Sequence, residues 1–303
     1  MYQIIQKRKI WLSLSGFLML VSITALIAWG LNFGIDFKGG SLLEVRFLQD
    51  RPAVSEIQES SGDLNLGALM AQPIGEKDMI FRFRDVEEEV HQNFLTLLNN
   101  LAGGDEENMA IEELRFDSVG PSIGAELKRK SVSAIIIVLL FIIFYIAIVF
   151  RKVSKPVSSW KYGITAIITL FHDVIIVLGI FAILGKFYGI EINTPFVAAI
   201  LTVLGYSVND TIVVFDRIRE NLPKSEENFE NTINTSLNQV ITRSINTSFT
   251  TLLVLVSILV FGGATIKDFI LALSIGVFVG TYSSIFLASP ILVVWEKLKN
   301  SKV

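Results

Sequence analysis

The chain has 303 residues, of which 51% are hydrophobic, and its mean hydropathy is +0.57 with a formal net charge of −3. It contains no Cys and two His, which excludes disulfides and thiolate metal sites and argues against a histidine-rich metal centre. This composition is typical of a polytopic membrane protein that carries one modest polar domain.

Six apolar runs are each near the length that about 30 Å of hydrocarbon requires. We predict membrane spans at Ile10–Leu31, Val132–Phe150, Tyr162–Leu184, Pro195–Phe215, Ile245–Phe261 and Phe269–Trp295. The first run follows basic residues, as in a signal peptide, but it is too long and lacks a good cleavage site, so we expect a retained anchor.

An even number of spans places both termini on one side of the membrane. The basic residues gather on that side, in residues 1–9, 151–161, 217–224 and 297–303, which makes it the cytoplasm. Residues 131–296 then hold the second to sixth spans, with cytoplasmic loops near 151–161 and 217–243. The stretch from Glu220 to Arg243 has helical spacing of its apolar residues, and we expect it to lie along the membrane surface.

Residues 32–130 form the only segment polar enough for an aqueous domain, and we expect this domain to be exported. Its pattern predicts, in order, a strand (Ser41–Leu48), a helix (Ala53–Ser60), a strand near Leu64–Ala71, a strand (Met79–Arg84), a helix (Val86–Leu101) and a strand (Ala110–Ser118). This order predicts a small α+β domain of the split βαβ, ferredoxin-like type. Residues 32–127 hold 19 Asp and Glu against 7 Lys and Arg, a surface that either binds a basic partner or an unfolded chain, or only keeps the domain solvated.

A carboxylate interrupts the fourth span. Asp210, between Asn209 and Thr211, lies about fifteen residues from Pro195, or roughly 22 Å along the helix, and so nearer the cytoplasm than the midplane. Holding an Asp within a spanning helix costs about 2.5–3.5 kcal/mol, so such residues usually face a bundle interior and mark an ion or proton path. A carboxyl group there can bind a proton and release it when a cation approaches, which couples proton flow to conformational change. The alternative is a structural hydrogen bond to a neighbouring helix, shared with Asn209 and Thr211.

Other charged residues could take part in the same path. Arg243, at the cytoplasmic start of the fifth span, is the candidate mobile cation, although an arginine at a helix end can also snorkel to the interface without any role in transport. Asp173, near mid-membrane in the third span, either belongs to the proton path or bonds to a neighbouring helix, whereas we expect the adjacent His172 to be a packing residue. We expect Asp216 and Arg217 to anchor and orient the end of the fourth span.

No HExxH, GxSxG or Walker sequence occurs, so metalloprotease, serine hydrolase and P-loop ATPase chemistry have no support. We therefore expect no enzymatic activity, no cofactor, no metal and no nucleic-acid partner. The energy for transport would come from the membrane potential and proton gradient, worth about 2.3 kcal/mol per charge per 100 mV.

Three stretches carry a resemblance to a known family: NFGIDFKGGS (Asn32–Ser41), VGPSIGAEL (Val119–Leu127) and GYSVNDTIVVFDRIREN (Gly205–Asn221). They resemble the SecF family of protein-export membrane proteins, in the resistance-nodulation-division superfamily, which has the same plan of six spans with one exported domain after the first. The sequence VND is similar to SecF, whereas SecD typically has VDAN.

The resemblance implies an accessory subunit that works with SecD and the SecYEG translocon, with YajC and YidC as further partners. Such a subunit uses proton flow to promote passage of preproteins across the bacterial inner membrane. The resemblance also implies that Asp210, Arg243 and the pair His172 and Asp173 occupy positions characteristic of the family.

Two other functions stay open. A half-sized drug, metal or lipid efflux transporter of the same superfamily would generally carry large exported domains in both halves of a doubled chain. A purely structural assembly factor would use Asp210 only as an interhelical hydrogen bond, and it should tolerate Asp210→Asn, which a proton carrier should not.

Overall fold

The computed structural model describes residues 1–105, 107–150 and 158–300. Most of the predicted loop near 151–161 and the end of the predicted segment 297–303 lie outside these residues. The chain divides into two compact units, a helical unit (Met1–Asn32 and Val132–Val303) and an α/β unit (Phe33–Ser131).

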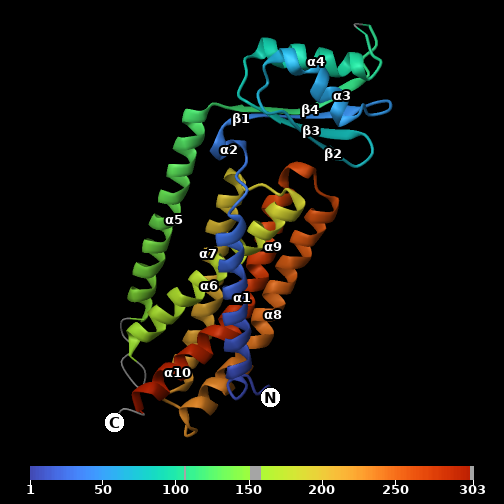
Figure 1. Cartoon of the computed structure of the whole chain (residues 1–303). Helices are drawn as coiled ribbons and strands as arrows, with labels where there is room; N and C mark the ends of the chain where they lie inside the picture. Colours follow the sequence, from blue (N-terminus) through green and yellow to red (C-terminus); the bar gives the residue numbers. More distant parts are fainter. Residues whose placement is uncertain (106, 151–157, 301–303) are drawn as a thin grey trace. The chain divides into compact units, whose positions relative to one another are not determined.

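The described residues include six helical runs long and apolar enough to cross a membrane, which confirms a polytopic helical membrane protein. They are α1 (Arg8–Trp29), α5 (Pro121–Phe150), α6 (Ser159–Tyr188), α7 (Thr194–Asn221), α8 (Phe229–Phe261) and a sixth run of α9 (Ala264–Ser283), a π-helical turn (Ser284–Ala288) and α10 (Ser289–Asn300) (Figure 1). Most of the helices extend beyond the predicted spans because polar flanks continue them, whereas α1 ends at Trp29, before the predicted end at Leu31. The clearest case is α5, which begins at Pro121 rather than Val132, with a proline in the first-turn position that favours it.

The stretch Glu220–Arg243, which we expect to lie along the membrane surface, is divided between the end of α7 at Asn221 and the start of α8 at Phe229. Helix α8 runs without a break from Phe229 to Phe261, and its start is capped by Asn228, whose side chain accepts the N–H of Asn231 at 2.9 Å. The apolar residues that set the helical spacing face the protein, since Ile233 and Leu237 are fully buried. Residues Phe229–Arg243 therefore pack within the helical unit as the first turns of α8.

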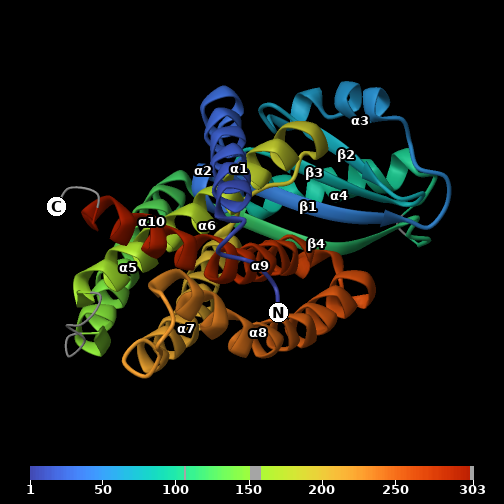
Figure 2. The same ribbon diagram turned by 90° about the horizontal axis from the view of Figure 1, so that it is seen from below.

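Close packing of α9 on α7 depends on two glycines. Seen from below, α9 lies among α6, α7 and α8 (Figure 2). A Cβ atom added at Gly276 would lie 2.1 Å from Cγ2 of Val203, and one at Gly280 would lie 3.0 Å from Cβ of Ser207. Gly276 and Gly280 form a GxxxG pattern, which here marks a contact between two helices.

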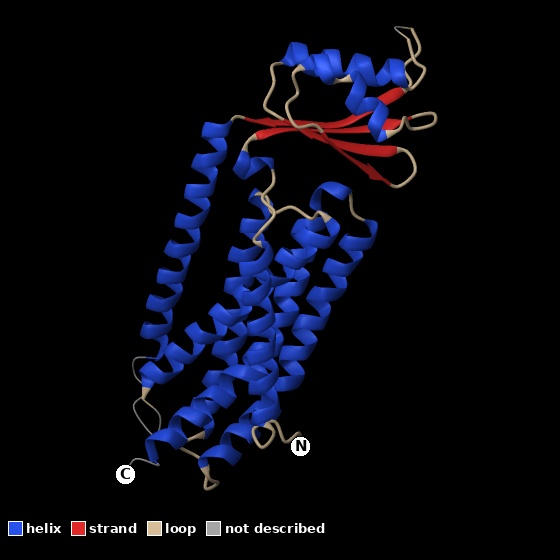
Figure 3. Cartoon of the chain, viewed as in Figure 1, coloured by secondary structure: helices blue, strands red, loops and turns tan. Residues whose placement is uncertain are grey.

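The α/β unit contains a four-stranded antiparallel sheet in the order β2-β3-β1-β4, within the described residues. Its elements are α2 (Ile35–Lys38), β1 (Gly40–Phe47), α3 (Val54–Ser60), β2 (Met70–Ile74), β3 (Asp78–Phe83), α4 (Glu88–Leu101) and β4 (Ile111–Val119). Helices α3 and α4 lie on one face of the sheet (Figure 3). Alternate residues of β1, Leu43, Val45 and Phe47, are fully buried against them, as the period of two requires.

The second predicted strand, near Leu64–Ala71, is misplaced. Residues Gly62–Leu64 form a 3-10 turn, and Asn65 and Gly67 have φ of 49° and 72°, left-handed values that end an extended run. The strand begins only at Met70, at the sheet edge, where Pro73 is tolerated. The other strands and helices of this unit lie within about two residues of their predicted bounds, the usual spread of such boundaries.

The paired glycines before β1 are required by the backbone. Gly39 and Gly40 have φ of 78° and 123°, which side chains rarely allow. A Cβ atom at Gly39 would lie 2.9 Å from Cα of Pro121, and one at Gly40 would lie 2.7 Å from the carbonyl oxygen of Phe83. The pair therefore lets the chain enter the sheet beside the start of α5.

Candidate functional site

Asp210 lies on α7 between hydroxyl groups of two other helical segments. Its Oδ1 accepts a hydrogen bond from Oγ of Ser244 on α8 at 2.6 Å, and its Oδ2 accepts one from Oγ of Ser284 in the π-helical turn. The residue is half-buried. A serine hydroxyl donates to a carboxylate and accepts from a carboxylic acid, so this arrangement accommodates both protonation states of Asp210.

The polar neighbours of Asp210 face other surroundings. Asn209 is exposed within this chain, whereas Thr211 is buried, because successive helical residues are rotated by about 100°. The side-chain amide of Asn209 thus lies beside Asp210 on the exposed side of α7.

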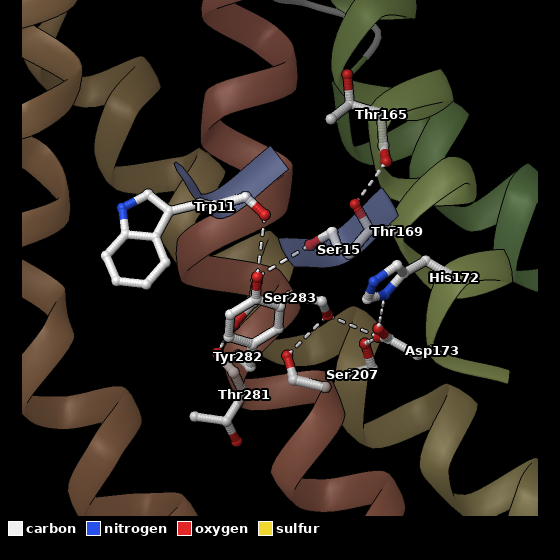
Figure 4. A network of polar contacts seen from close by, with 12 residues as sticks. Trp11, Ser15, Thr165, Thr169, His172, Asp173, Ser207, Thr281, Tyr282 and Ser283 are labelled. Carbon is white, nitrogen blue, oxygen red and sulfur yellow. Dashed lines mark hydrogen bonds and ion pairs between the residues drawn. The ribbon is translucent and has the colours of Figure 1, made fainter. Parts of the chain in front are cut away.

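Asp173, on α6, is completely buried in a separate cluster (Figure 4). Its Oδ1 lies 2.9 Å from Nδ1 of His172, and its Oδ2 accepts hydrogen bonds from Oγ of Ser207 at 2.5 Å and from Oγ of Ser283 at 2.8 Å. His172 is itself 3% exposed and directly contacts the carboxylate. The third span therefore contributes a fully enclosed carboxyl group with three polar contacts.

Four consecutive polar residues link the two carboxylates, and we call them the hydroxyl collar: Thr281, Tyr282, Ser283 and Ser284. Their side chains contact Ser248 of α8 at 2.5 Å, Ser15 and the carbonyl of Trp11 in α1 at 3.0 and 3.1 Å, Asp173 of α6 and Asp210 of α7, respectively. Because positions in a helix are about 100° apart, four successive residues reach neighbours on every side of α9. The collar thus connects one helix to four others through hydroxyl groups.

Sequence reasoning missed the collar and its partner Ser248, and it missed that Ser207 and Ser244 donate to Asp173 and Asp210. The available signal was the polar run Thr281–Ser284 inside an otherwise apolar span. Single Ser and Thr residues are common in spanning helices, and only the structure shows that these meet carboxylates.

The other predicted charges are not brought to Asp210. Arg243 is exposed, and in the described part of the chain it forms no ion pair with Asp210, although it directly precedes the donor Ser244. Asp216 pairs with Arg219 at 2.7 Å, and Arg217 pairs with Glu220 at 2.6 Å. These local pairs lie at the end of α7.

No group of three or more His, Cys, Asp or Glu side chains in the described residues could hold a metal ion. The side chains that meet at Asp173 and Asp210 are carboxyl, hydroxyl and imidazole groups, which can bind and pass protons.

Residues 102–298 match the family model described as protein export membrane protein SecD/SecF, C-terminal, and residues 25–48, which include the paired glycines, match the SecD/SecF GG motif. The protein translocase subunit SecF of Thermobaculum terrenum is 41% identical, over 98% of this chain and 94% of the relative. That of Synechocystis is 37% identical, over 95% and 92%.

Solved structures agree with these sequence matches. The crystal structure of SecDF, a translocon-associated membrane protein from Thermus thermophilus, has a TM-score of 0.80 and 31% identity, and a super-membrane-facing form of SecDF has a TM-score of 0.70 and 30% identity. This chain spans 39% of the SecDF chain, whereas it spans nearly the whole length of the SecF subunits. The chain belongs to the SecD/SecF family of protein-export membrane proteins, in which the relatives described here are SecF subunits.

Proposed function

We propose that this chain is a non-enzymatic accessory subunit of the Sec export machinery, which uses proton flow to promote passage of preproteins across the bacterial inner membrane. The names of its relatives support this function, as does a carboxyl group held by hydroxyl donors inside a spanning helix. The environment of Asp210 is the observation that carries the proposal. The relatives described above are export subunits, which favours this function over an efflux transporter.

Asp210 acts in this proposal as the proton carrier. When its carboxylate is protonated, the hydrogen bonds from Ser244 and Ser284 reverse or break, which changes the attraction of α8 and the π-helical turn to α7. Arg243 adjoins Ser244, so a movement of α8 that turned Arg243 toward Asp210 would favour the charged carboxylate and expel the proton. Asn209, Thr211 and Asp173 provide the further polar groups of the pathway.

Exposed residues on one side of α7 and α8 suit contact with the helices of a partner, which we propose to be SecD. Thr202, Gly205 and Asn209 of α7 are exposed, as are Arg243 and Thr247 of α8. An amide or a charged group facing lipid is costly, whereas small and polar residues suit contact between helices. A SecD subunit on this side would cover them, in keeping with the 39% of the SecDF chain that this chain spans.

We further propose that both termini lie in the cytoplasm and that the α/β unit is exported. The strand order β2-β3-β1-β4 with both longer helices on one face supports a ferredoxin-like fold for this unit. SecYEG, YajC and YidC are proposed as further partners from the family resemblance.

The deciding experiment measures preprotein accumulation in cells in which the only gene for this chain carries Asp210→Asn. An immunoblot first confirms normal levels of the protein and of SecD. Asp216→Asn is the matched control, since it makes the same change on the same helix at an exposed side chain paired with Arg219. We expect slow export that no longer responds to the proton gradient with Asp210→Asn alone. Normal export would favour the structural assembly factor and overturn the proposal.

A further inference from the structure

Each of the two collar serines that donate to a carboxylate has a second hydrogen-bond acceptor within reach. Oγ of Ser283 lies 2.8 Å from Asp173 and 3.1 Å from the carbonyl oxygen of Gly280. Oγ of Ser284 contacts Asp210 and lies 3.1 Å from the carbonyl oxygen of Thr281. A hydroxyl has one proton to donate, so each serine must choose between the carboxylate and the backbone.

Protonation of the carboxyl group decides that choice. A charged carboxylate attracts the hydroxyl proton, because hydrogen bonds to ionised acceptors are roughly twice as strong as neutral ones. A carboxylic acid donates its own proton instead, and the serine then donates to the backbone carbonyl. No side chain has to move further than a rotation of the hydroxyl.

The carbonyl of Gly280 connects the two serines. It accepts the backbone N–H of Ser284 as well as, in the alternative state, the hydroxyl of Ser283. Hydroxyls that bond back to the preceding turn perturb a helix, and this turn lies where α9 passes into the π-helical pairing of Ser284–Ala288. A proton bound at Asp173 therefore alters the backbone bond that places Ser284 against Asp210.

We propose that Asp173 is a positioning residue for Asp210, and that Ser283 and Ser284 couple the two carboxyl groups into one protonation unit. This inference deepens the proposed function and rests on Asp210 as the proton carrier. Among the described residues, the titratable or charged side chains near this network include His172, which contacts Asp173, Tyr282, which contacts Ser15 of α1, and Tyr206, which contacts Ser248. Arg243 adjoins Ser244 in the sequence.

The test is a pH titration of the full chain in lipid nanodiscs, followed by the infrared carboxyl stretch. The band lost in Asp210→Asn belongs to Asp210, and the band lost in Asp173→Asn belongs to Asp173. We expect Asp173→Asn to displace the titration midpoint of Asp210 by roughly half a pH unit or more. Because coupling is reciprocal, Asp210→Asn should displace the midpoint of Asp173 by the same amount.

Ser283→Ala separates coupling through the collar from direct repulsion between the carboxylates, and it should displace the Asp210 midpoint although it does not touch Asp210. Ser274→Ala is the matched control, since among the described residues the hydroxyl of this α9 serine donates to the carbonyl of Ile270, at 2.8 Å. Should Ser283→Ala fail to fold, Ser283→Cys replaces it, because a thiol is a weak donor. An Asp210 midpoint unchanged by Asp173→Asn, or by the Ser283 variant, overturns the inference. The titration does not depend on export, so normal export by Asp210→Asn would refute the proposed function while the coupling was still measured.

Discussion

Replacing Gly276 by Ala should destabilise the helical unit, because α9 meets α7 there without room for a methyl group. The new Cβ would lie 2.1 and 2.7 Å from the two Cγ atoms of Val203, whereas carbon atoms in contact are normally about 3.5–4.0 Å apart. Val203 is 1% exposed, and a β-branched side chain in a helix keeps one rotamer. Helix α9 would therefore have to move about 1.5 Å away from α7.

Overpacking of this kind costs about 1–3 kcal/mol, and replacing a glycine in a helix recovers about 0.5–1 kcal/mol. We expect a net loss of about 1–2 kcal/mol in the free energy of unfolding. Ser284 lies about two turns further along the same helical run, so the displacement should also weaken its hydrogen bond to Asp210 and slow export.

Reversible unfolding in mixed micelles with increasing dodecyl sulfate measures this loss. Gly205→Ala on α7 is the matched control, because no atom of the described residues lies within 4 Å of a Cβ atom there, and it should be at least as stable as the natural chain. Val203→Ala removes both colliding Cγ atoms, so the double variant should be more stable than the sum of the single changes predicts, by about 1 kcal/mol or more. Additive effects, with Gly276→Ala as stable as Gly205→Ala, would refute this account of the α7–α9 contact.

Three further outcomes are expected. In the α/β unit, Nε of Arg46 donates to Asp78 at 2.8 Å and holds the pKa of Asp78 below its usual range, so the pair contributes stability above the unfolded value of about 3.9 and loses it as pH falls through the lowered folded value. Asp78→Asn should flatten that acid dependence in hydrogen exchange of β1 and β3, corrected for intrinsic rates. Lys161 and Glu296 lie 2.5 Å apart with side chains 5% and 14% exposed, so Lys161→Met should cost about 3–5 kcal/mol in the micelle assay, whereas adding Glu296→Leu should restore most of it. Oδ1 of Asn234 accepts hydrogen bonds from the backbone N–H groups of Ile4 and Ile5 at 2.9 and 3.2 Å. Asn234→Ala should therefore make the N-terminal segment more susceptible to limited proteolysis.

The spans were predictable because a lipid-facing helix must be apolar over about 20 residues. The ends of the helices were not predictable, because an apolar run ends at the first polar residues whereas the helical backbone hydrogen bonds continue through them. Helix α5 extends back to Pro121 and α8 back to Phe229 for this reason. In the first turns of α8, Ile233 and Leu237 are buried against the protein. The same spacing of apolar residues would also suit a helix that lies on a membrane surface, so the sequence alone does not distinguish the two.

In the α/β unit, alternation predicted the strands whose one face is buried. Strand β2 was misplaced because it is a short edge strand with no fully buried residue, so its pattern carries little information. The left-handed conformation of Asn65, which delays the strand, is a property of that turn rather than of the hydrophobic pattern.

The two carboxylates could be found from sequence because each is costly in a membrane, but their relationship could not. Asp173 and Asp210 lie on different helices, and the residues that join them, Ser283 and Ser284, belong to a third. A hydroxyl group in a spanning helix costs little free energy when it donates to a backbone carbonyl of its own helix, so its presence in the sequence does not indicate a partner on another helix. Both serines do lie near such backbone acceptors, at 3.1 Å.

The two carboxylates differ in burial, and in the proposed function this difference would give them different roles. Asp173 is completely enclosed by this chain, whereas Asp210 is half-buried and lies next to the exposed Asn209. In the proposed function, a proton entering from a path shared with a partner would reach Asp210 first, and the collar would pass the change to Asp173, which His172 and Ser207 also contact. A partner subunit that covers Asn209 should then act directly on Asp210 and only indirectly on Asp173. In the proposed function, Asp210 would then be the point of proton exchange, and Asp173 would be the internal group that positions the collar.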